Sequence, residues 1–216
     1  MWRRLLLIII LITILTRVYS QDNFTAKFFG VSFHPDGDVN ADNMPTKIDK
    51  NGVAVINLGI YVGYENFFHK DKLSSKVVTA FYSDCGGLFS GLLHIGLRGV
   101  ILDTKNFSIN GGIGPTFIFR RSWYSKFDNY INSGFYRGNE TDFWQYKFLW
   151  YGGELEFNYK LNERLDLSTT FIPGYPKLLE LSIGVRYRFK VHQQVTKNRS
   201  VGKEHWKNHC FGYYYK

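Results

Sequence analysis

Ser32 and His34 are candidates for a catalytic site. On an extended chain, residues two apart point to the same side and lie about 7 Å from each other. A serine nucleophile, a histidine base and a carboxylate that orients the histidine are the smallest set of groups for acyl transfer. Asp84 offers the carboxylate, so the sequence holds a candidate catalytic site if the fold brings Asp84 to Ser32 and His34.

A second set of residues with chemical potential consists of ionisable side chains at alternate positions of largely apolar segments. These residues are Glu65, His94, Arg98, Glu154, Glu156, Asp166, Glu180, Arg186 and Arg188. Alternate positions of a strand face one side, and a charge buried without a partner is strongly unfavourable. We expect these side chains to pair and to plug an interior. The alternative is a proton or small-ion path in which His94 is the titrating group.

The segments that carry these residues have the pattern of strands. Eight segments alternate between apolar residues and polar or small ones with a period of two, and no segment has a helical period. The predicted strands are residues 24–34, 53–67, 74–84, 89–102, 107–120, 146–160, 164–173 and 178–189.

The connections between the segments are of two kinds. Those after the second, fourth and sixth segments read HKDK, DTKN and LNER, which are tight polar turns, whereas those after the first and fifth run over residues 35–52 and 121–145. Short turns at one end and long loops at the other are typical of barrels in the outer membrane. We predict an all-β fold, an eight-stranded antiparallel up-and-down transmembrane β-barrel over residues 21–189.

The composition of the two faces favours a membrane barrel over a soluble one. In the fifth segment the polar face carries Ser108, Asn110, Gly112, Gly114 and Thr116, which are small enough to fill a narrow barrel without an open channel. A soluble barrel would turn a face dense in Lys, Glu and Thr to water. Aromatic residues of the apolar face also fall at two heights, as at the two interfaces of a bilayer.

The last segment, LELSIGVRYRF over residues 179–189, ends on an aromatic residue after strict alternation. Its GVRYRF end is similar to the C-terminal strand signal that the barrel-assembly machinery reads. The pattern over residues 24–189 resembles the OmpA- and OmpX-type barrels of Gram-negative bacteria. This resemblance implies insertion into the outer membrane and contact with its lipids and lipopolysaccharide. We expect a non-enzymatic protein that serves envelope integrity or surface interaction.

The resemblance also leaves an enzymatic alternative, because some eight-stranded barrels are lipid A acyltransferases or deacylases with a catalytic site near the extracellular end. Such an acyl hydrolase or acyltransferase would use Ser32, His34 and Asp84 at the extracellular rim. Against this alternative, Ser32 and His34 reverse the His-x-Ser order of the deacylases, and a charged lumen does not suit an acyl chain. A third class, a narrow transport pore, is disfavoured by the number of strands.

The two ends of the chain differ from the barrel. Residues 1–20 combine two arginines, an apolar run from Leu5 to Leu15 and small residues near Ser20, which predicts a cleaved signal peptide. The chain carries a net charge of +9, of which the leader holds +3 and residues 190–216 hold +5, so residues 21–189 hold about +1. We expect no nucleic-acid binding by the barrel, and a flexible basic periplasmic tail over residues 190–216 that contacts lipid headgroups or cell wall.

The two long loops differ in composition. The second is rich in aromatic residues and carries Arg120, Arg121 and Arg137. Arginine pairs with phosphate and aromatic rings stack on sugars, so we expect this loop to bind lipopolysaccharide; anchoring in the membrane interface is the alternative. The first loop is rich in aspartate but lacks the glycine and the glutamate of an EF-hand. We therefore expect no metal and no cofactor.

Overall fold

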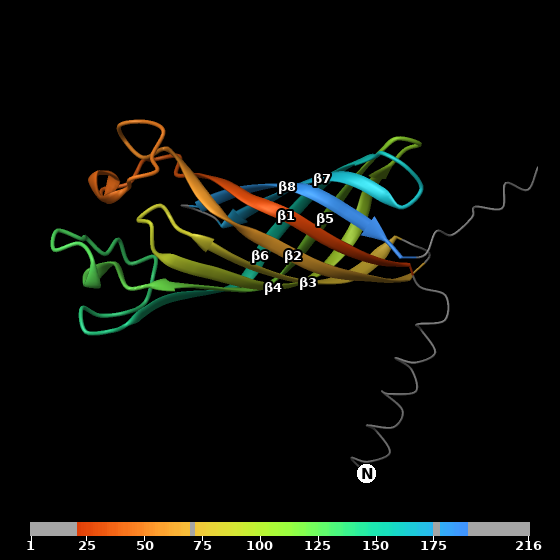
Figure 1. The fold of residues 1–216 in the computed structure, drawn as a ribbon. Helices are drawn as coiled ribbons and strands as arrows, with labels where there is room; N and C mark the ends of the chain where they lie inside the picture. The colour runs from red at the N-terminus through yellow and green to blue at the C-terminus, as the bar shows by residue number, and fades with distance from the viewer. Residues whose placement is uncertain (1–20, 70–71, 175–177, 190–216) are drawn as a thin grey trace, which may run out of the picture.

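The chain folds into one closed sheet. The computed structural model describes residues 21–69, 72–174 and 178–189. The strands are β1 (Asp22–Phe33), β2 (Ala54–His69), β3 (Leu73–Ser83), β4 (Phe89–Asp103), β5 (Phe107–Arg121), β6 (Trp144–Lys160), β7 (Leu165–Gly174) and β8 (Leu178–Arg188). Each strand pairs antiparallel with the next, and β1 pairs with β8, so the sheet closes into a barrel (Figure 1). The predicted eight-stranded up-and-down barrel is confirmed, and each predicted strand boundary lies within two residues of the observed one.

Two predicted segments lie outside the described residues: the signal peptide, residues 1–20, and the basic tail, residues 190–216. The loops of the described chain contain two short 3-10 helices, Ala41–Asn43 and Trp123–Ser125. Over the described ranges, no helix has the length and the apolar character needed to cross a membrane.

The connections give the barrel two unlike ends. Residues 34–53, 84–88 and 122–143 join strands at one end, which we call the long-loop end and which lies at the left of Figure 1. The opposite end, which we call the short-turn end, carries the turns 104–106 and 161–164, and there β1 begins and β8 ends.

The loops of the long-loop end are held in place by hydrogen bonds. The carboxylate of Asp49 accepts hydrogen bonds from the backbone N–H groups of Asn51, Val53 and Ala54, and these bonds lower the pKa of Asp49. The first loop also meets the third, because the side-chain oxygen of Asn40 accepts the N–H of residue 131 at 2.8 Å and its amide nitrogen donates to the carbonyl of the same residue at 2.9 Å. These contacts bridge the two longest loops.

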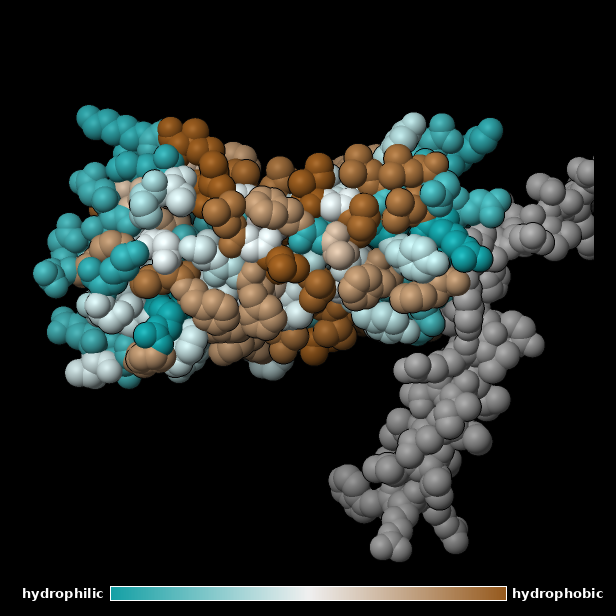
Figure 2. Space-filling view, viewed as in Figure 1, coloured by the Kyte–Doolittle hydropathy of each residue, from teal (hydrophilic) through white to brown (hydrophobic). Residues whose placement is uncertain are grey.

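Side chains alternate between two environments along each strand. In β3, the buried side chains are Ser74, Lys76, Val78, Ala80 and Tyr82, whereas the residues between them are exposed or half-buried. The outward face is mostly apolar, and on the side of the barrel in view Figure 2 shows a hydrophobic band between hydrophilic ends. The inward face is therefore the polar and small one.

One irregularity of the wall lies between β5 and β6. The register shifts between Gly114 and Thr116, because Pro115 has no N–H to donate to the ladder. Gly152 of β6 lies against the Thr116 side chain and has no room for a side chain of its own. Strand β7 pairs only with the stretch Leu155–Lys160 of β6. The β5–β6 hairpin therefore extends beyond the wall formed by β7 and β8 at the long-loop end.

Candidate functional site

The interior of the short-turn half holds a network of buried ion pairs, centred on Glu154 and Glu156 of β6. The Nζ atom of Lys76, from β3, lies 2.5 Å from Oε1 of Glu154 and 2.6 Å from Oε2 of Glu156. The Nζ atom of Lys27, from β1, lies 3.1 Å from Oε2 of Glu156. All four side chains are completely buried. The two lysines thus compensate two carboxylates that share one face of a strand.

Three arginines complete this network. Nη1 of Arg98, from β4, lies 2.7 Å from Oε1 of Glu65 on β2, and Nη2 of Arg98 lies 3.2 Å from Oε1 of Glu156. Arg186 of β8 donates from Nε and Nη2 to Asp166 of β7 at 2.9 and 2.7 Å, and Arg188 bonds the same carboxylate. Every strand except β5 contributes a charged group, so the network ties together seven strands.

The structure brings seven of the nine predicted interior residues into this network. They are Glu65, Arg98, Glu154, Glu156, Asp166, Arg186 and Arg188. The prediction missed Lys27 and Lys76. The signal for both was present, since Lys27 follows buried Thr25 and Lys76 follows buried Ser74 in the period of two.

The two other predicted interior residues lie elsewhere. His94 is buried on β4 and its Nδ1 lies 2.7 Å from the hydroxyl of Thr116, and no ion pair of the described residues includes it. Glu180 lies toward the long-loop end of β8, where Tyr82 hydrogen-bonds to its carboxyl group. Of the predicted interior charges, seven therefore form one network, and Glu180 is a separate carboxyl group.

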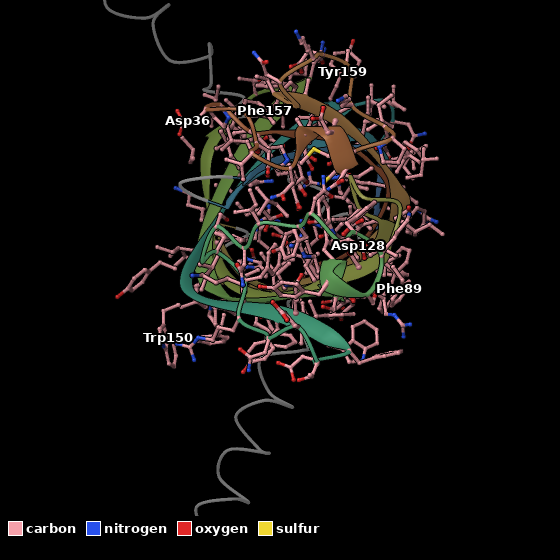
Figure 3. The ribbon with its side chains drawn as sticks, turned by 90° about the vertical axis from the view of Figure 1, so that its left-hand side faces the viewer. Asp36, Phe89, Asp128, Trp150, Phe157 and Tyr159 are labelled. Carbon is pink, nitrogen blue, oxygen red and sulfur yellow. The ribbon has the colours of Figure 1, made fainter. Side chains whose placement is uncertain are left out.

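An apolar layer lies between the network and the long-loop end. Its buried members are Tyr61, Val78, Ala80, Tyr82, Leu92, Ile118 and Ile172. Tyr61 connects the two regions, because its hydroxyl donates to Glu154 at 3.1 Å. Seen from the long-loop end, side chains fill the ring of strands, and Trp150 points away from it (Figure 3).

A cavity opens beyond the apolar layer, at the long-loop end, and we call it the outer cavity. It encloses about 630 Å³, including the space at its opening. Its lining includes Asn57, Tyr82, Arg120 and Glu180 from strands. Loops 34–53 and 84–88 contribute His34, Asp38 and Asp84, and loop 122–143 contributes Trp123, Tyr130 and Tyr136.

Arg120 belongs to this cavity, which corrects its prediction as a residue of the surface-binding loop. It is only 7% exposed. Its Nε donates to Gln145 at 3.0 Å and its Nη2 donates to the hydroxyl of Tyr130 at 2.9 Å. The guanidinium also lies over the rings of Trp123 and Tyr136, at 4.5 and 4.0 Å from their centroids. The prediction failed because Arg120 stands on the inward face of β5.

The other two arginines of that prediction lie outside the barrel. Arg121 stacks on the ring of Phe143 at 3.2 Å and lies 5.6 Å from that of Trp144, on the outward face. Arg137 is exposed, and its backbone pairs with Tyr146 at the edge of β6. Both guanidinium groups therefore remain candidates for contact with a surface ligand.

Asp84 has a structural role in the loop after β3. One carboxylate oxygen accepts the backbone N–H groups of Gly86 and Leu88 at 3.0 and 2.8 Å. The other accepts the indole N–H of Trp123 at 2.8 Å. Asp84 thus fixes Trp123 as a wall of the outer cavity.

Ser32 and His34 do not form a catalytic pair with Asp84. The hydroxyl of Ser32 accepts a hydrogen bond from the amide of Asn57. Nδ1 of His34 faces Asp38, with 3.7 Å between Nδ1 and Oδ2. Within the described residues, no hydrogen bond joins Ser32, His34 and Asp84 to one another, so the serine has no general base.

Two titratable groups of the outer cavity stay neutral. Burial lowers the pKa of His34, the charge of Arg120 lowers it further, and Asp38 opposes both effects. Burial and the neighbouring Asp84 raise the pKa of the Cys85 thiol, which therefore stays protonated. Over the described ranges, no group of three His, Cys, Asp or Glu side chains is placed to hold a metal ion.

These features define a class: a closed eight-stranded antiparallel barrel with an apolar outer face and a charged, filled interior. No family model and no curated protein matches the chain. Similar solved structures include the N-terminal β-barrel domain of Pseudomonas aeruginosa OprF, with 11% identity over 79% of this chain and 99% of that chain and a TM-score of 0.43.

Two further solved barrels are similar in fold. One is Ail, the attachment invasion locus protein of Yersinia pestis, in complex with the heparin analogue sucrose octasulfate, with 13% identity over 79% of this chain and 97% of that chain and a TM-score of 0.44. The other is the outer membrane protein OprG of Pseudomonas aeruginosa, with 16% identity over 78% of this chain and 96% of that chain and a TM-score of 0.37. These likenesses concern the fold alone, and the barrel class rests on the strand pairing of this chain.

Proposed function

We propose that this protein is an outer-membrane β-barrel with a sealed interior that serves envelope integrity or surface interaction through its long loops. The observation that carries the proposal is the apolar outward face. Exposed side chains on this face include Phe28, Leu58, Ile60, Val77, Phe81, Ile95, Leu97, Ile113 and Ile183. A belt of this kind is unfavourable in water and favourable in the hydrocarbon core, and the pairing of β1 with β8 closes the sheet that carries it.

Aromatic residues at both rims of the belt support a bilayer as its partner. Tyr64 and Tyr159 are exposed near the short-turn end. At the long-loop end, the outward rings of Phe89 and Trp144 lie 6.2 Å apart, and Phe119 lies 5.9 Å from Trp144. Aromatic side chains at these two heights suit the two interfaces of a membrane.

The path of the chain supports an orientation. Strand β1 begins and β8 ends at the short-turn end, and bacterial barrels keep short turns in the periplasm and long loops outside. The predicted signal peptide would deliver the chain from the periplasmic side. The basic tail, residues 190–216, would then lie in the periplasm, with lipid headgroups or cell wall as its proposed partners, and insertion would use the barrel-assembly machinery.

The filled interior favours a surface role over a pore or an enzyme. A network of ion pairs and an apolar layer occupy the lumen, and a wide water path has no place between them. A lipid A-modifying enzyme would need a base for Ser32 and space for an acyl chain. We propose lipopolysaccharide as a surface partner, with Arg121 and Arg137 as its phosphate contacts.

The proposal is tested by reconstituting the mature chain, residues 21–216, in liposomes. We expect heat-modifiable mobility on SDS gels, quenching of tryptophan fluorescence by brominated lipids, and no stepwise conductance in planar bilayers. A protein that stays in the aqueous phase without binding vesicles would contradict the membrane assignment. Stepwise conductance would contradict the sealed interior.

A further inference from the structure

Three polar atoms of residues that line the outer cavity are buried and have no hydrogen-bond partner among the described residues. They are Nε2 of His34, Oδ1 of Asn57 and Oε1 of Glu180. Asn57 is 3% exposed and Glu180 is 4% exposed. Leaving such atoms unpaired is costly, and most buried polar atoms in proteins have a partner. Their gathering around one cavity points to an occupant that supplies hydrogen bonds.

The kinds of bond that this occupant must make follow from the three atoms and Arg120. The amide oxygen of Asn57 accepts hydrogen bonds, and so does Nε2 of a neutral His34 whose Nδ1–H faces Asp38. Arg120 adds a donor group, whose Nε and Nη2 donate to Gln145 and Tyr130. A cavity that offers both acceptors and a donor suits hydroxyl groups, because each hydroxyl both donates and accepts.

The charges of the cavity disfavour an ionic occupant. Among the described residues that line it, Arg120 alone carries a positive charge, against the carboxyl groups of Asp38, Asp84 and Glu180. An anion would meet these three carboxyl groups. A cation would meet Arg120, which already lies over the rings of Trp123 and Tyr136. The occupant is therefore electrically neutral.

The walls and the opening of the cavity suit a ring-shaped molecule. Rings of Trp123, Tyr130 and Tyr136 line it, and aromatic faces pack against the C–H faces of sugars. A crevice between the first and third long loops shares His34, Asp38 and Ser133 with the cavity and gives access from outside.

We propose that the outer cavity binds one neutral sugar ring, either a free sugar or a terminal unit of a surface glycan. This inference deepens the proposed surface role and rests on it only for the outward orientation of the long-loop end. The site itself is present in the folded barrel in detergent, so its binding is measurable without a membrane.

The test uses the mature chain refolded in detergent, with its folded state checked by heat-modifiable mobility. Glucose, galactose, mannose and N-acetylglucosamine are titrated, and binding is followed by isothermal titration calorimetry and by tryptophan fluorescence, since Trp123 forms part of the wall. We expect saturable binding of at least one sugar. Tyr136→Ala and Asn57→Ala should each weaken it by roughly tenfold or more, which corresponds to about 1.4 kcal/mol.

Matched control variants lie away from the cavity. Tyr151→Ala removes an aromatic ring that is 81% exposed on the outer face of β6, and Asn106→Ala removes an exposed amide at the short-turn end. Both should bind the sugar as the unaltered protein does. Equal weakening in Tyr136→Ala and Tyr151→Ala would overturn the assignment of the site to the cavity.

A further comparison separates the two sources of the sugar. If the free sugar displaces bound lipopolysaccharide, the natural ligand is a surface glycan. If the free sugar binds and lipopolysaccharide has no effect, the natural ligand is a free sugar. Both outcomes support the proposal. A folded barrel that binds none of the four sugars would hold ordered water only, which overturns it. Vesicle insertion without sugar binding overturns the sugar site and leaves the proposed function standing. Sugar binding without vesicle insertion supports the sugar site and contradicts the proposed membrane location.

Discussion

Lys76 and Glu154 meet across the lumen, with Nζ and Oε1 2.5 Å apart and neither side chain exposed. They come from β3 and β6, which are not neighbours in the sheet. A contact of this kind braces opposite walls of the barrel, in contrast to the hydrogen-bonded ladder, which joins only adjacent strands. The stability of the barrel is therefore sensitive to single charges in its interior.

Replacing Lys76 by methionine should destabilise the barrel by about 3–5 kcal/mol, because Glu154 and Glu156 would lose a shared partner while staying buried. The measurement is the free energy of unfolding in urea, followed by the fraction of compact protein on SDS gels. Lys72→Met, at an exposed position beside β3, is the control and should change little. Equal stability of the two variants would show that the network does not brace the walls.

Enlarging Gly86 should disturb the outer cavity. A Cβ atom at this position would lie 2.7 Å from Cζ2 of Trp123, so Gly86→Ala should displace the indole at a cost of about 1–3 kcal/mol. The expected readouts are a shifted tryptophan emission and faster proteolysis of loop 122–143. Gly99→Ala, whose nearest atom would lie at 3.7 Å, serves as control. Unchanged emission in Gly86→Ala would mean that Trp123 does not pack there.

Falling pH should weaken the long-loop end through His34. Burial lowers the pKa of His34 from its ordinary 6.5, so the unfolded chain takes up this proton at a higher pH than the folded one. The stability contributed by neutral His34 is complete above pH 6.5 and is lost as the pH falls toward the folded pKa. The unaltered protein should thus lose more unfolding free energy than His34→Gln between about pH 7.5 and pH 5. Parallel pH profiles would contradict this role.

Replacing Ser32 by alanine should leave lipid A unchanged. The hydroxyl of Ser32 is bonded to Asn57, and Asp84 is bonded to Trp123 and to two backbone groups. Mass spectrometry of lipid A from cells that express the unaltered protein or Ser32→Ala is the measurement. We expect the same acylation pattern in both and in cells without the protein. A pattern that depends on Ser32 would restore the enzymatic alternative.

The alternation of residue types was sufficient to predict the strands and the closed barrel, because neighbouring residues of a barrel strand face opposite sides of its wall. The same alternation also indicates the direction of the Arg120 side chain, which the prediction assigned to the surface loop. Counting in steps of two from Ser108 reaches Arg120, which places its side chain inside. Lys27 and Lys76 were overlooked because lysine is usually exposed, and only partners on other strands make its burial favourable.

The outer cavity lay beyond prediction, since it depends on the path of loops. The bond between Asp84 and Trp123 joins residues 39 positions apart, and the contact between Asn40 and loop 122–143 spans a greater distance in sequence. Neither pair stands in a periodic pattern. Contacts between loops depend on how the loops pack over the mouth of the barrel, and neither periodicity nor composition predicts these contacts.

The seven-strand network has a consequence for how the barrel is assembled. Glu156 of β6 meets Lys27 of β1 and Arg186 of β8, so these two ion pairs are complete together only when β1 and β8 have joined. A chain in which that seam has not formed would lack one or both of these ion pairs and keep those of Glu156 with Lys76 and Arg98. The complete network therefore stabilises the closed barrel relative to a sheet whose first and last strands are still apart.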